Sequence, residues 1–433
     1  MQVPALAGAL VTTLVCGSAI VLSEAADEAN FAKGRLVLAR FPSPKSAFAV
    51  VKRLERDNRI DVLTKSAGTV RRTALLRVGA RNLHGVLSAL SAVRVQARVF
   101  DNDTEAMAVR RLKEIGPYPD PRDATRRPIS LTNFESYEQI AASLDYYAWS
   151  AAVNGSIRRF VIGQSYEGRD IVGIRIGNSA AKKRIVLIEC GIHAREWASH
   201  TSCLYMIHHL ATRPDDYSNL LDRYEFHILP VANPDGYVYT WKVDPWWRHN
   251  RRPTHRSQNP SCVGVDLNRN FVAGPPCSGP DLNPCSPVYC GPAPFSEPES
   301  RAIRAYVMSV KDDAEYYVSL HAYGRMWMFP YGYTYRRAPN YAALMRKTKE
   351  AVSTLRETFD HIYRYGPIIN TIYEVTGCSI DWAYTTAGIP YSFAIELPEA
   401  KRDNKRASFF IDRSEIIPFG KEILTGLEVL WTA

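Results

Sequence analysis

Residues 184–197 read RIVLIECGIHAREW, and this stretch decides the fold of the chain. Its apolar part, residues 185–188, is typical of a buried β-strand, and His193 and Glu196 follow closely after it. A later apolar run, residues 316–320, is followed at once by His321. Each run therefore places a potential metal ligand at the end of a predicted strand.

These three side chains match the ligand set of a catalytic zinc ion. Such a site takes three protein ligands from His, Glu and Asp and keeps a fourth position open for water. A His-x-x-Glu pair alone arises by chance in many chains of this length. The distant histidine completes the set, so the sequence predicts a zinc hydrolase with one Zn²⁺ bound by His193, Glu196 and His321.

The residues after about position 130 predict one large α/β domain. Strands are expected at residues 184–189, 225–231, 316–320 and 391–395, and helices at residues 198–210, 297–310 and 341–358. This alternation favours a central mixed, mostly parallel sheet with helices on both faces. Ligands of such sheets bind beyond the carboxyl ends of the strands, where the three potential ligands fall.

A smaller domain precedes the large one. Strand character is found at residues 36–39, 60–63, 74–78 and 93–100, and amphipathic stretches at residues 43–56 and 81–90. The resulting order, βαββαβ, predicts a ferredoxin-like α+β domain.

The N-terminus predicts a secreted, extracellular protein. Residues 4–22 are uncharged and mostly apolar, and the small residues Ser23 and Ala25 fit the cleavage site of a signal peptide. No Lys or Arg precedes this run, so an uncleaved N-terminal anchor is the alternative. Seven cysteines lie after residue 25, and six of them could pair in an oxidising compartment. Asn102 and Asn154 begin glycosylation sequons.

A polar, proline-rich linker joins the two domains. It carries Arg122, Arg126 and Arg127, which are accessible targets for an activating trypsin-like protease. Because Arg127 precedes a proline, scission after Arg126 is favoured. The predicted units are a signal peptide at 1–25, a pro domain with the linker at 26–126, and a catalytic domain at 127–433.

The net charge of +10 would suit a nucleic acid or an anionic surface. Most of the excess lies before the zinc-bearing part, since residues 26–125 hold 19 Lys and Arg against 11 Asp and Glu. No nucleic-acid motif accompanies this charge, and no later run of about 18 apolar residues would span a membrane. We therefore expect a solvated basic face, no nucleic-acid or membrane partner, and a monomer.

Two acidic residues are candidates for roles beside the metal. Glu396 follows the predicted strand at residues 391–395, where a carboxylate is ordinarily a surface cap. Beside strand ends that carry metal ligands, it becomes a candidate for the proton transfer that peptide hydrolysis needs. Asp266 is a candidate acceptor for the second nitrogen of a ligand histidine.

Arginines recur in the intervening loops, at Arg195, Arg248 and Arg269. One guanidinium can stabilise a tetrahedral oxyanion, and another can hold a carboxylate through two hydrogen bonds. Singly, each of these arginines would more often be a surface residue.

With these residues in place, the chain resembles the secreted metallocarboxypeptidases of the A/B family, which are synthesised as proenzymes. The resemblance covers nearly everything after the signal peptide and is strongest from residue 164 to residue 396. The matching segments, in the family's order, are residues 165–169, 191–197, 233–236, 264–271, 319–323, 330–333, 371–373, 379–382 and 391–397.

The resemblance implies the chemistry of the site. It makes His193, Glu196 and His321 the zinc ligands and Glu396 the general base and acid, and it has Arg248 polarise the scissile carbonyl and hold its oxyanion. Three residues, Asn268, Arg269 and Tyr373, would bind the terminal carboxylate of a peptide or protein. The last of them would lie on a mobile loop that closes over the substrate.

The resemblance also implies contacts farther from the metal. Arg195 and Tyr323 would contact substrate residues upstream of the scissile bond. The digestive members of the family have acidic pro segments, whereas this one is basic, so we expect it to cover the active site differently. The implied disulfides join Cys190 with Cys203, Cys262 with Cys285 and Cys277 with Cys290, leaving Cys378 unpaired near the specificity pocket.

Ile380 carries the prediction of specificity. In the family, an aspartate at this position selects Lys and Arg, whereas an aliphatic residue selects apolar side chains. Ile380 therefore points to A-type specificity, with Gly332, Ile368 and Ala394 shaping a pocket for bulky or aromatic side chains. The alternatives are a carboxypeptidase of mixed or basic preference and a catalytically silent binding protein, which would have lost a ligand or Glu396; neither is lost.

Overall fold

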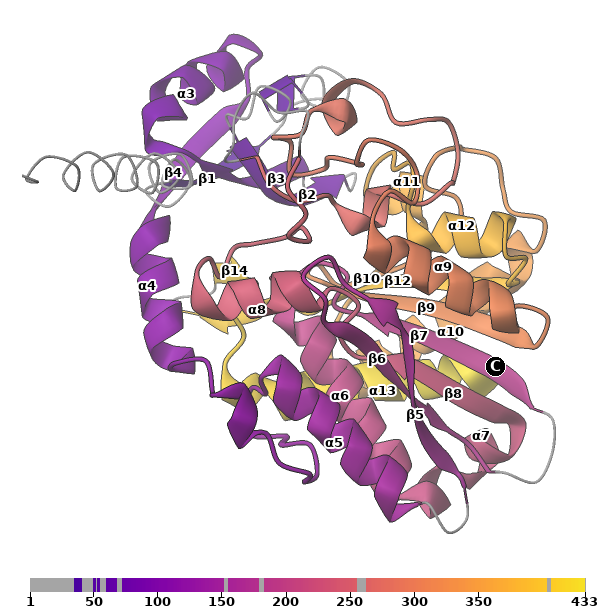
Figure 1. Cartoon of the computed structure of the whole chain (residues 1–433). Helices are drawn as coiled ribbons and strands as arrows, with labels where there is room; N and C mark the ends of the chain where they lie inside the picture. Colours follow the sequence, from indigo (N-terminus) through magenta and orange to yellow (C-terminus); the bar gives the residue numbers. More distant parts are fainter. Residues whose placement is uncertain are drawn as a thin grey trace, which may run out of the picture.

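The structure of the protein is a computed structural model, and it describes residues 35–40, 50–51, 53–54, 60–67, 72–151, 155–178, 183–254, 262–402 and 406–432. Within these residues the chain forms a small N-terminal sheet and a large sheet covered by helices (Figure 1). The predicted signal peptide and the sequon at Asn154 lie outside the described residues. None of the described helices has the length and apolar character needed to cross a membrane.

The N-terminal unit is a four-stranded antiparallel sheet with the strand order β2-β3-β1-β4. Val37, Leu76 and Val86 are fully buried in its core. The order is that of the predicted ferredoxin-like domain, although most of the first predicted helix, residues 43–56, lies outside the described residues. The described elements are β1 (Arg35–Arg40), β2 (Ile60–Ala67), β3 (Arg72–Val78), α3 (Leu83–Ala92) and β4 (Gln96–Asp103).

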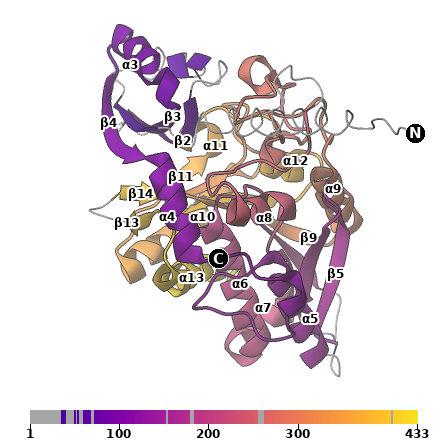
Figure 2. The same ribbon diagram turned by 60° about the vertical axis from the view of Figure 1, so that its left-hand side comes forward.

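The helix α4 (Thr104–Ile115) leads from this unit to the large domain and lies along it (Figure 2). A short 3-10 turn, η2 (Pro121–Asp123), follows in the linker, where the Asp120 side chain accepts a hydrogen bond from the backbone N–H of Arg122 at 2.9 Å. The linker is therefore locally ordered up to the point where the large domain begins.

The large sheet has eight strands in the order β11-β10-β12-β9-β7-β8-β6-β5. Its centre, β12-β9-β7-β8, is parallel, while β10 pairs antiparallel with β12 and parallel with β11, and β6 and β5 pair antiparallel at the other edge. This mixed, mostly parallel sheet confirms the predicted fold class. The strands are β5 (Ile157–Gln164), β6 (Asp170–Ile176), β7 (Arg184–Cys190), β8 (Tyr224–Leu229), β9 (Ala314–Ala322), β10 (Met326–Phe329), β11 (Arg364–Pro367) and β12 (Tyr391–Leu397).

Each face of this sheet has its own hydrophobic core, because successive side chains of a strand point to opposite faces. On β7, Val186 and Ile188 join the core formed with α6 (Trp197–Thr212), α10 (Tyr341–Phe359) and α13 (Ile416–Thr432). Ile185 and Leu187 join the core formed with α9 (Pro298–Val310) and α12 (Ser379–Thr385). All four are buried, which explains why β7 reads as a continuous apolar run.

The predicted helices at residues 198–210, 297–310 and 341–358 are present, as α6, α9 and α10. Several starts are capped as the sequence allows: Ser136 accepts from the N–H of Gln139 at 3.2 Å before α5, and Asn233 from that of Gly236 at 3.0 Å before α8. The helices are α5 (Tyr137–Ser150), α6 (Trp197–Thr212), α7 (Ser218–Arg223), α8 (Pro234–Lys242), α9 (Pro298–Val310), α10 (Tyr341–Phe359), α11 (Ile368–Thr371), α12 (Ser379–Thr385) and α13 (Ile416–Thr432), and a small hairpin is formed by β13 (Ala400–Arg402) and β14 (Arg406–Ser408).

Two of the three expected disulfides are formed. Cys190 is bonded to Cys203 and Cys262 to Cys285. The expected bond between Cys277 and Cys290 is absent: both are free thiols whose sulfurs lie in hydrogen-bond contact, and this contact lowers the pKa of Cys277. The two side chains are therefore adjacent, as the family pattern implies, but are not covalently joined. The third free cysteine of the described residues, Cys378, is buried and unpaired, as expected.

Candidate active site

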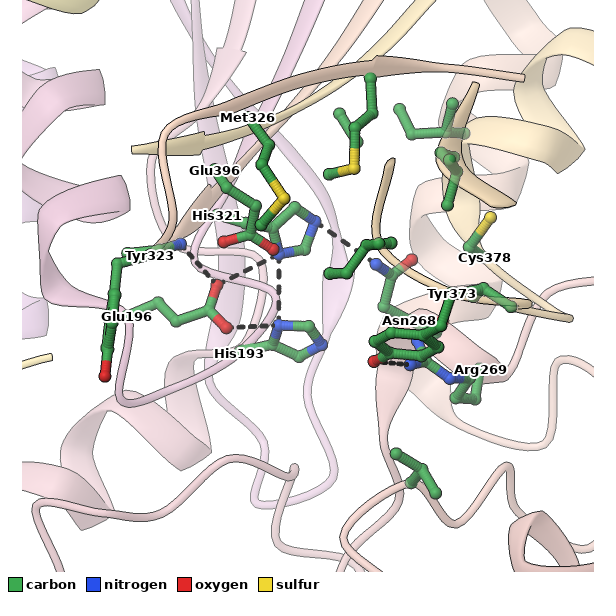
Figure 3. Close-up of a pocket in the computed structure, with 18 of the residues that line it drawn as sticks. His193, Glu196, Asn268, Arg269, His321, Tyr323, Met326, Tyr373, Cys378 and Glu396 are labelled. Atoms are coloured by element: carbon green, nitrogen blue, oxygen red, sulfur yellow. Dashed lines mark hydrogen bonds and ion pairs between the residues drawn. The ribbon is translucent and has the colours of Figure 1, made fainter. Parts of the chain in front are cut away.

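Three potential metal ligands meet at the carboxyl ends of β7 and β9 (Figure 3). The Nδ1 atom of His193 lies 2.8 Å from one carboxylate oxygen of Glu196, and Nδ1 of His321 lies 3.1 Å from the other. The two Nδ1 atoms are 3.2 Å apart. All three residues are buried, so their polar atoms converge on one small volume.

The loop between β7 and His193 has a shape that a glycine permits. Gly191 has a φ of +67°, and a Cβ atom there would lie 2.3 Å from Nε2 of His200. This close approach of the backbone to α6 brings His193 next to Glu196, which is the residue before the first turn of that helix. The local sequence therefore builds the His-x-x-Glu pair at a strand-to-helix turn.

Both histidines are oriented by hydrogen bonds to their second nitrogen. The predicted acceptor Asp266 lies 3.1 Å from Nε2 of His193, and Ser319 Oγ lies 2.9 Å from Nε2 of His321. A proton on Nε2 leaves the Nδ1 lone pair available to a metal. Behind Ser319, its Oγ is 3.3 Å from the buried carboxyl of Glu189, which also accepts a hydrogen bond from Tyr317.

The donor set fits a catalytic zinc ion. Two imidazole nitrogens and one carboxylate, each held by an outer hydrogen bond, are the ligands that zinc takes in hydrolytic sites. Burial lowers the pKa of His193, which favours the neutral ring that binds metal. The ligands also line an open cavity, which leaves one side of the site accessible.

Glu396 lies beside the ligands on β12. Strand pairing places it level with His321 on β9 and with Met326 on β10, and it lines the cavity (Figure 3). Burial, followed by the negative charge of Glu196, raises its pKa to about 8. A nearby cation would lower this value. The surface cap that the sequence also allowed is excluded, and the carboxyl group can exchange protons near neutral pH.

The guanidinium of Arg248 reaches the same cavity from the loop after α8. It donates to Asp266 from Nη2 at 2.8 Å and from Nε at 3.1 Å, and its Nη1 lies 3.5 Å from Glu196. Although burial alone would raise the pKa of Asp266, the charges of Arg248 and Arg269 hold it well below its usual value. Asp266 is thus an anion that positions both a ligand histidine and an arginine.

A second polar group lies farther along the cavity. Arg269 donates to the Tyr373 hydroxyl at 3.2 Å (Figure 3) and to the Asn268 carbonyl at 2.9 Å. The side-chain oxygen of Asn268 accepts from the N–H of Ser379 at 2.9 Å. The backbone at Gly377 packs closely against the backbone of Arg269. Its φ is +69°, and a Cβ there would lie 2.3 Å from the Arg269 carbonyl oxygen, so this packing requires glycine. The structure therefore brings together the guanidinium, amide and phenol expected to bind a carboxylate.

Beyond these polar groups the cavity ends among apolar side chains. It measures about 920 Å³ including its open mouth. Ile380, Ile368 and Ala394 line it as predicted, and the free thiol of Cys378 lies in the same wall. Gly332 is not a lining residue but packs directly behind the wall, where a Cβ would meet Ile368 and Asp381 at 3.2 Å. The lining also includes the apolar residues Pro287, Val288, Ala322, Met326, Met328, Ile372 and Val375.

Arg195 and Tyr323 are the two residues expected to contact upstream parts of the substrate, and Tyr323 lines the cavity. The Arg195 guanidinium stacks on Phe409 at 4.7 Å and donates to the carbonyl of Trp246 at 3.2 Å, and the residue is not among those that line the cavity. Its apolar platform explains why a charged side chain can be buried there.

Sequence reasoning missed the Glu189 and Ser319 side chains behind His321. The available signal was a carboxylate inside an otherwise apolar strand run, because such a group must find partners when buried. The sulfur-containing wall formed by Met326 and Met328 was also missed, since β10 is only four residues long.

The comparisons with known proteins agree with this geometry. Residues 146–426 match the zinc carboxypeptidase family. Mast cell carboxypeptidase A of Rattus norvegicus is 37% identical over 277 residues, which are 63% of this chain and 65% of that protein. Human carboxypeptidase B is 38% identical over 288 residues, or 65% of this chain and 67% of that protein.

A solved structure is similar over almost the whole chain. The carboxypeptidase A from Helicoverpa armigera superposes with a TM-score of 0.82 at 26% identity, and the match covers 93% of this chain and 98% of that one. The likeness therefore includes the N-terminal unit as well as the large sheet. Because the family match spans more than half of the sequence, the chain belongs to the zinc carboxypeptidase family.

Proposed function

We propose that the protein is a secreted zinc-dependent exopeptidase, made as a zymogen, which removes apolar or aromatic residues from the C-termini of peptides and proteins. One observation carries this proposal: a single cavity holds a metal triad, the carboxyl of Glu396, a carboxylate-binding group at Arg269, and an apolar end that includes Ile380. The order of these groups along the cavity suits a chain terminus.

The buried cation at Arg269 argues for an exopeptidase. Its side chain is 6% exposed and lies beside Asn268 and Tyr373, so a substrate that ends in this part of the cavity would leave its carboxylate there. A terminal carboxylate would form charge-assisted hydrogen bonds with the guanidinium, and Tyr373 would move aside to admit it. An internal peptide bond offers no such charge.

The residues around the metal triad would carry the chemistry. Zinc, when bound, would supply a Lewis acid for the scissile carbonyl and lower the pKa of water. Glu396 would accept a proton from the attacking water and return it to the amide nitrogen that leaves. Arg248, which lies 3.5 Å from Glu196, would stabilise the negative charge that develops on the carbonyl oxygen.

The apolar end of the cavity favours an A-type preference. Its described lining, from Met328 through Val375 to Ile380, includes no carboxylate, so a substrate Lys or Arg would lose its hydration without gaining a partner. A mixed or basic preference, as the similarity to carboxypeptidase B would allow, requires an acid in this wall. A catalytically silent binding protein would be expected to lack one of the three metal ligands or Glu396. His193, Glu196, His321 and Glu396 are all present and line the cavity.

The test of this preference is the substitution Ile380→Asp. The unmodified enzyme should prefer a substrate ending in Phe over its matched Arg substrate by roughly a hundredfold in kcat/KM. In the variant, an aromatic ring would desolvate the new carboxylate, whereas a guanidinium would pair with it. We expect the Phe-to-Arg ratio to fall by at least about tenfold.

The control for this experiment is Ile380→Asn, because asparagine has the shape of aspartate but no charge. It should weaken cleavage after Phe without improving cleavage after Arg. An unmodified enzyme that already prefers Arg would contradict the A-type assignment, whatever the variants do.

The contacts of the three linker arginines support a role of the linker as an activation segment. Arg127 is held by two hydrogen bonds to Glu135, at 2.9 and 2.8 Å, and Arg122 donates to Asp120 at 3.0 Å. Arg126 is exposed. A trypsin-like protease must take an arginine side chain into its own pocket. The exposed side chain of Arg126 therefore favours scission after this residue.

Limited trypsin treatment should therefore give a product that begins at Arg127 and should raise peptidase activity. N-terminal sequencing of the product and the rate of peptide hydrolysis before and after scission check this expectation. Arg126→Gln should delay activation while leaving the final activity unchanged. Full activity in the uncut protein would contradict latency but not the enzyme assignment.

A further inference from the structure

The linker helix α4 inserts one cation into the large domain. Arg111 is 2% exposed, and its guanidinium carbon lies 4.7 Å from the ring of Phe134, 4.7 Å from that of Trp197 and 5.7 Å from that of Phe410. Its Nη1 donates to the carbonyl of Ile411 at 2.8 Å, a contact that joins residues 300 positions apart. We call the three rings the arginine cage.

Burial of a cation is costly unless it finds compensating partners. The arginine cage supplies them, because ring faces attract a guanidinium and the carbonyl of Ile411 accepts a hydrogen bond from it. A planar guanidinium can stack and donate at once, which a lysine ammonium does less well. The cage is therefore built as a binding site for an arginine side chain.

The cage adjoins the proposed active site. Trp197 directly follows the ligand Glu196. The ring of Phe410 lies 4.4 Å from that of Trp246, and the guanidinium of Arg77 on β3 lies over the Trp246 ring at 5.4 Å. Arg77 also lies 3.9 Å from Asp244 and is buried. The basic N-terminal unit thus contacts aromatic and acidic residues of the large domain through two arginines.

Further contacts hold the segment between α4 and the linker. The carbonyl of Ile115 lies 3.5 Å from Nη2 of Arg413, and the ring of Tyr118 lies 5.7 Å from that of Trp241 and 4.5 Å from the ammonium of Lys242. On the side of the N-terminal segment, these contacts are made by Ile115 and Tyr118, which both precede Arg126 in the sequence. Scission of the linker would therefore leave them intact.

We propose that the arginine cage is a guanidinium-binding site that holds the N-terminal unit on the large domain after the linker has been cut, with Arg111 as its occupant. This inference rests on the proposed function only in that it assumes scission near Arg126. It explains how a basic pro segment can be retained: its arginines bind rings beside the active site. Release then depends on α4 as well as on the linker.

The test measures association rather than activity. The full chain is cut with trypsin, and the N-terminal fragment and the large domain are separated by size-exclusion chromatography over a dilution series. The uncut protein, the fragment and the large domain are identified by mass. In the unmodified protein the fragment should co-elute with the large domain, and Arg111→Ala should weaken their association by about tenfold or more.

The matched control is Lys113→Ala, which removes an exposed cation from the same helix and should leave association unchanged. A thermal melt of each uncut protein shows that the variant is folded. A double-mutant cycle that combines Arg111→Ala with Phe134→Leu measures the coupling between the two side chains. A general loss of packing would not produce this coupling. If Arg111 binds the ring, the effects of the two substitutions are not additive.

Equal dissociation of the fragment from the unmodified protein and from Arg111→Ala would overturn the inference. An equally large effect of Lys113→Ala, or additive effects in the cycle, would overturn it too. Because no substrate is used, loss of peptidase activity or a different specificity would contradict the proposed function without touching this result. Conversely, an active enzyme whose fragment separates freely would refute the anchor alone.

Discussion

Glu396→Gln should lower the turnover of the trypsin-treated enzyme by ~10² to 10⁴ fold while leaving metal content and substrate binding close to those of the unmodified protein. The amide has the same shape but cannot accept the proton of the attacking water. Burial raises the pKa of Glu396 to about 8, so this carboxyl group is poised to exchange a proton near neutral pH. The measurement is kcat and KM on one peptide, with zinc content by atomic absorption.

Glu399→Gln is the matched control, because Glu399 lies three residues farther along, pairs with Arg325 at 3.0 Å and does not line the cavity. It should change turnover by less than about twofold, as surface substitutions usually do. A Glu396→Gln enzyme within about twofold of the parent rate would mean that another group transfers the proton.

Removal of the metal should have a still larger effect. Dialysis against a chelator is expected to reduce peptide hydrolysis by about a thousandfold or more, since a bound cation contributes several kcal/mol to stabilisation of the developing charge. Zinc should restore the activity, and it should also raise the melting temperature of the metal-free protein, because it binds the native site.

Magnesium is the control for metal removal. It prefers oxygen ligands in octahedral geometry, whereas His193, Glu196 and His321 offer two nitrogens and one carboxylate. Magnesium should therefore restore neither activity nor thermal stability. Unchanged turnover in protein shown to be free of metal would contradict the proposed mechanism.

The centre of the fold could be predicted because its strands are buried on both faces. β7 and β9 are mostly apolar; His193 follows β7 by three residues, and His321 lies at the end of β9. The predicted boundaries of β7 and β12 differ from the observed ones by at most two residues. The convergence of metal ligands followed from this placement, since parallel strands end at the same edge of a sheet.

The edges of the large sheet could not be predicted in the same way. β5 reads IRRFVIGQ, and its side chains alternate neither in polarity nor in burial, because a bulge between Val161 and Gly163 shifts its register. β10 and β11 have four residues each, too few for a periodic signal. The partners of these strands are set by tertiary packing.

Contacts between residues distant in sequence were the other limit. The burial of Arg195 and Arg111 depends on Phe409 and Phe410, which lie some 200 to 300 positions away and carry no charge that would reveal them. The hydrogen bond from Ser319 to His321 was equally hidden, since serine is common in strands. The resemblance to a family supplied roles for residues, but not the side chains that orient them.

The most direct test of the central claim compares two peptides that differ only at their terminus. One peptide ends in phenylalanine with a free carboxylate, and the other ends in phenylalanine whose carboxylate is amidated. Both are incubated with the trypsin-activated protein, and the products are identified by mass spectrometry. Because Arg269 is placed to bind a terminal carboxylate, the free acid should lose one C-terminal residue while the amide stays intact. Equal cleavage of the amide, or scission at an internal bond, would contradict the assignment of a carboxypeptidase.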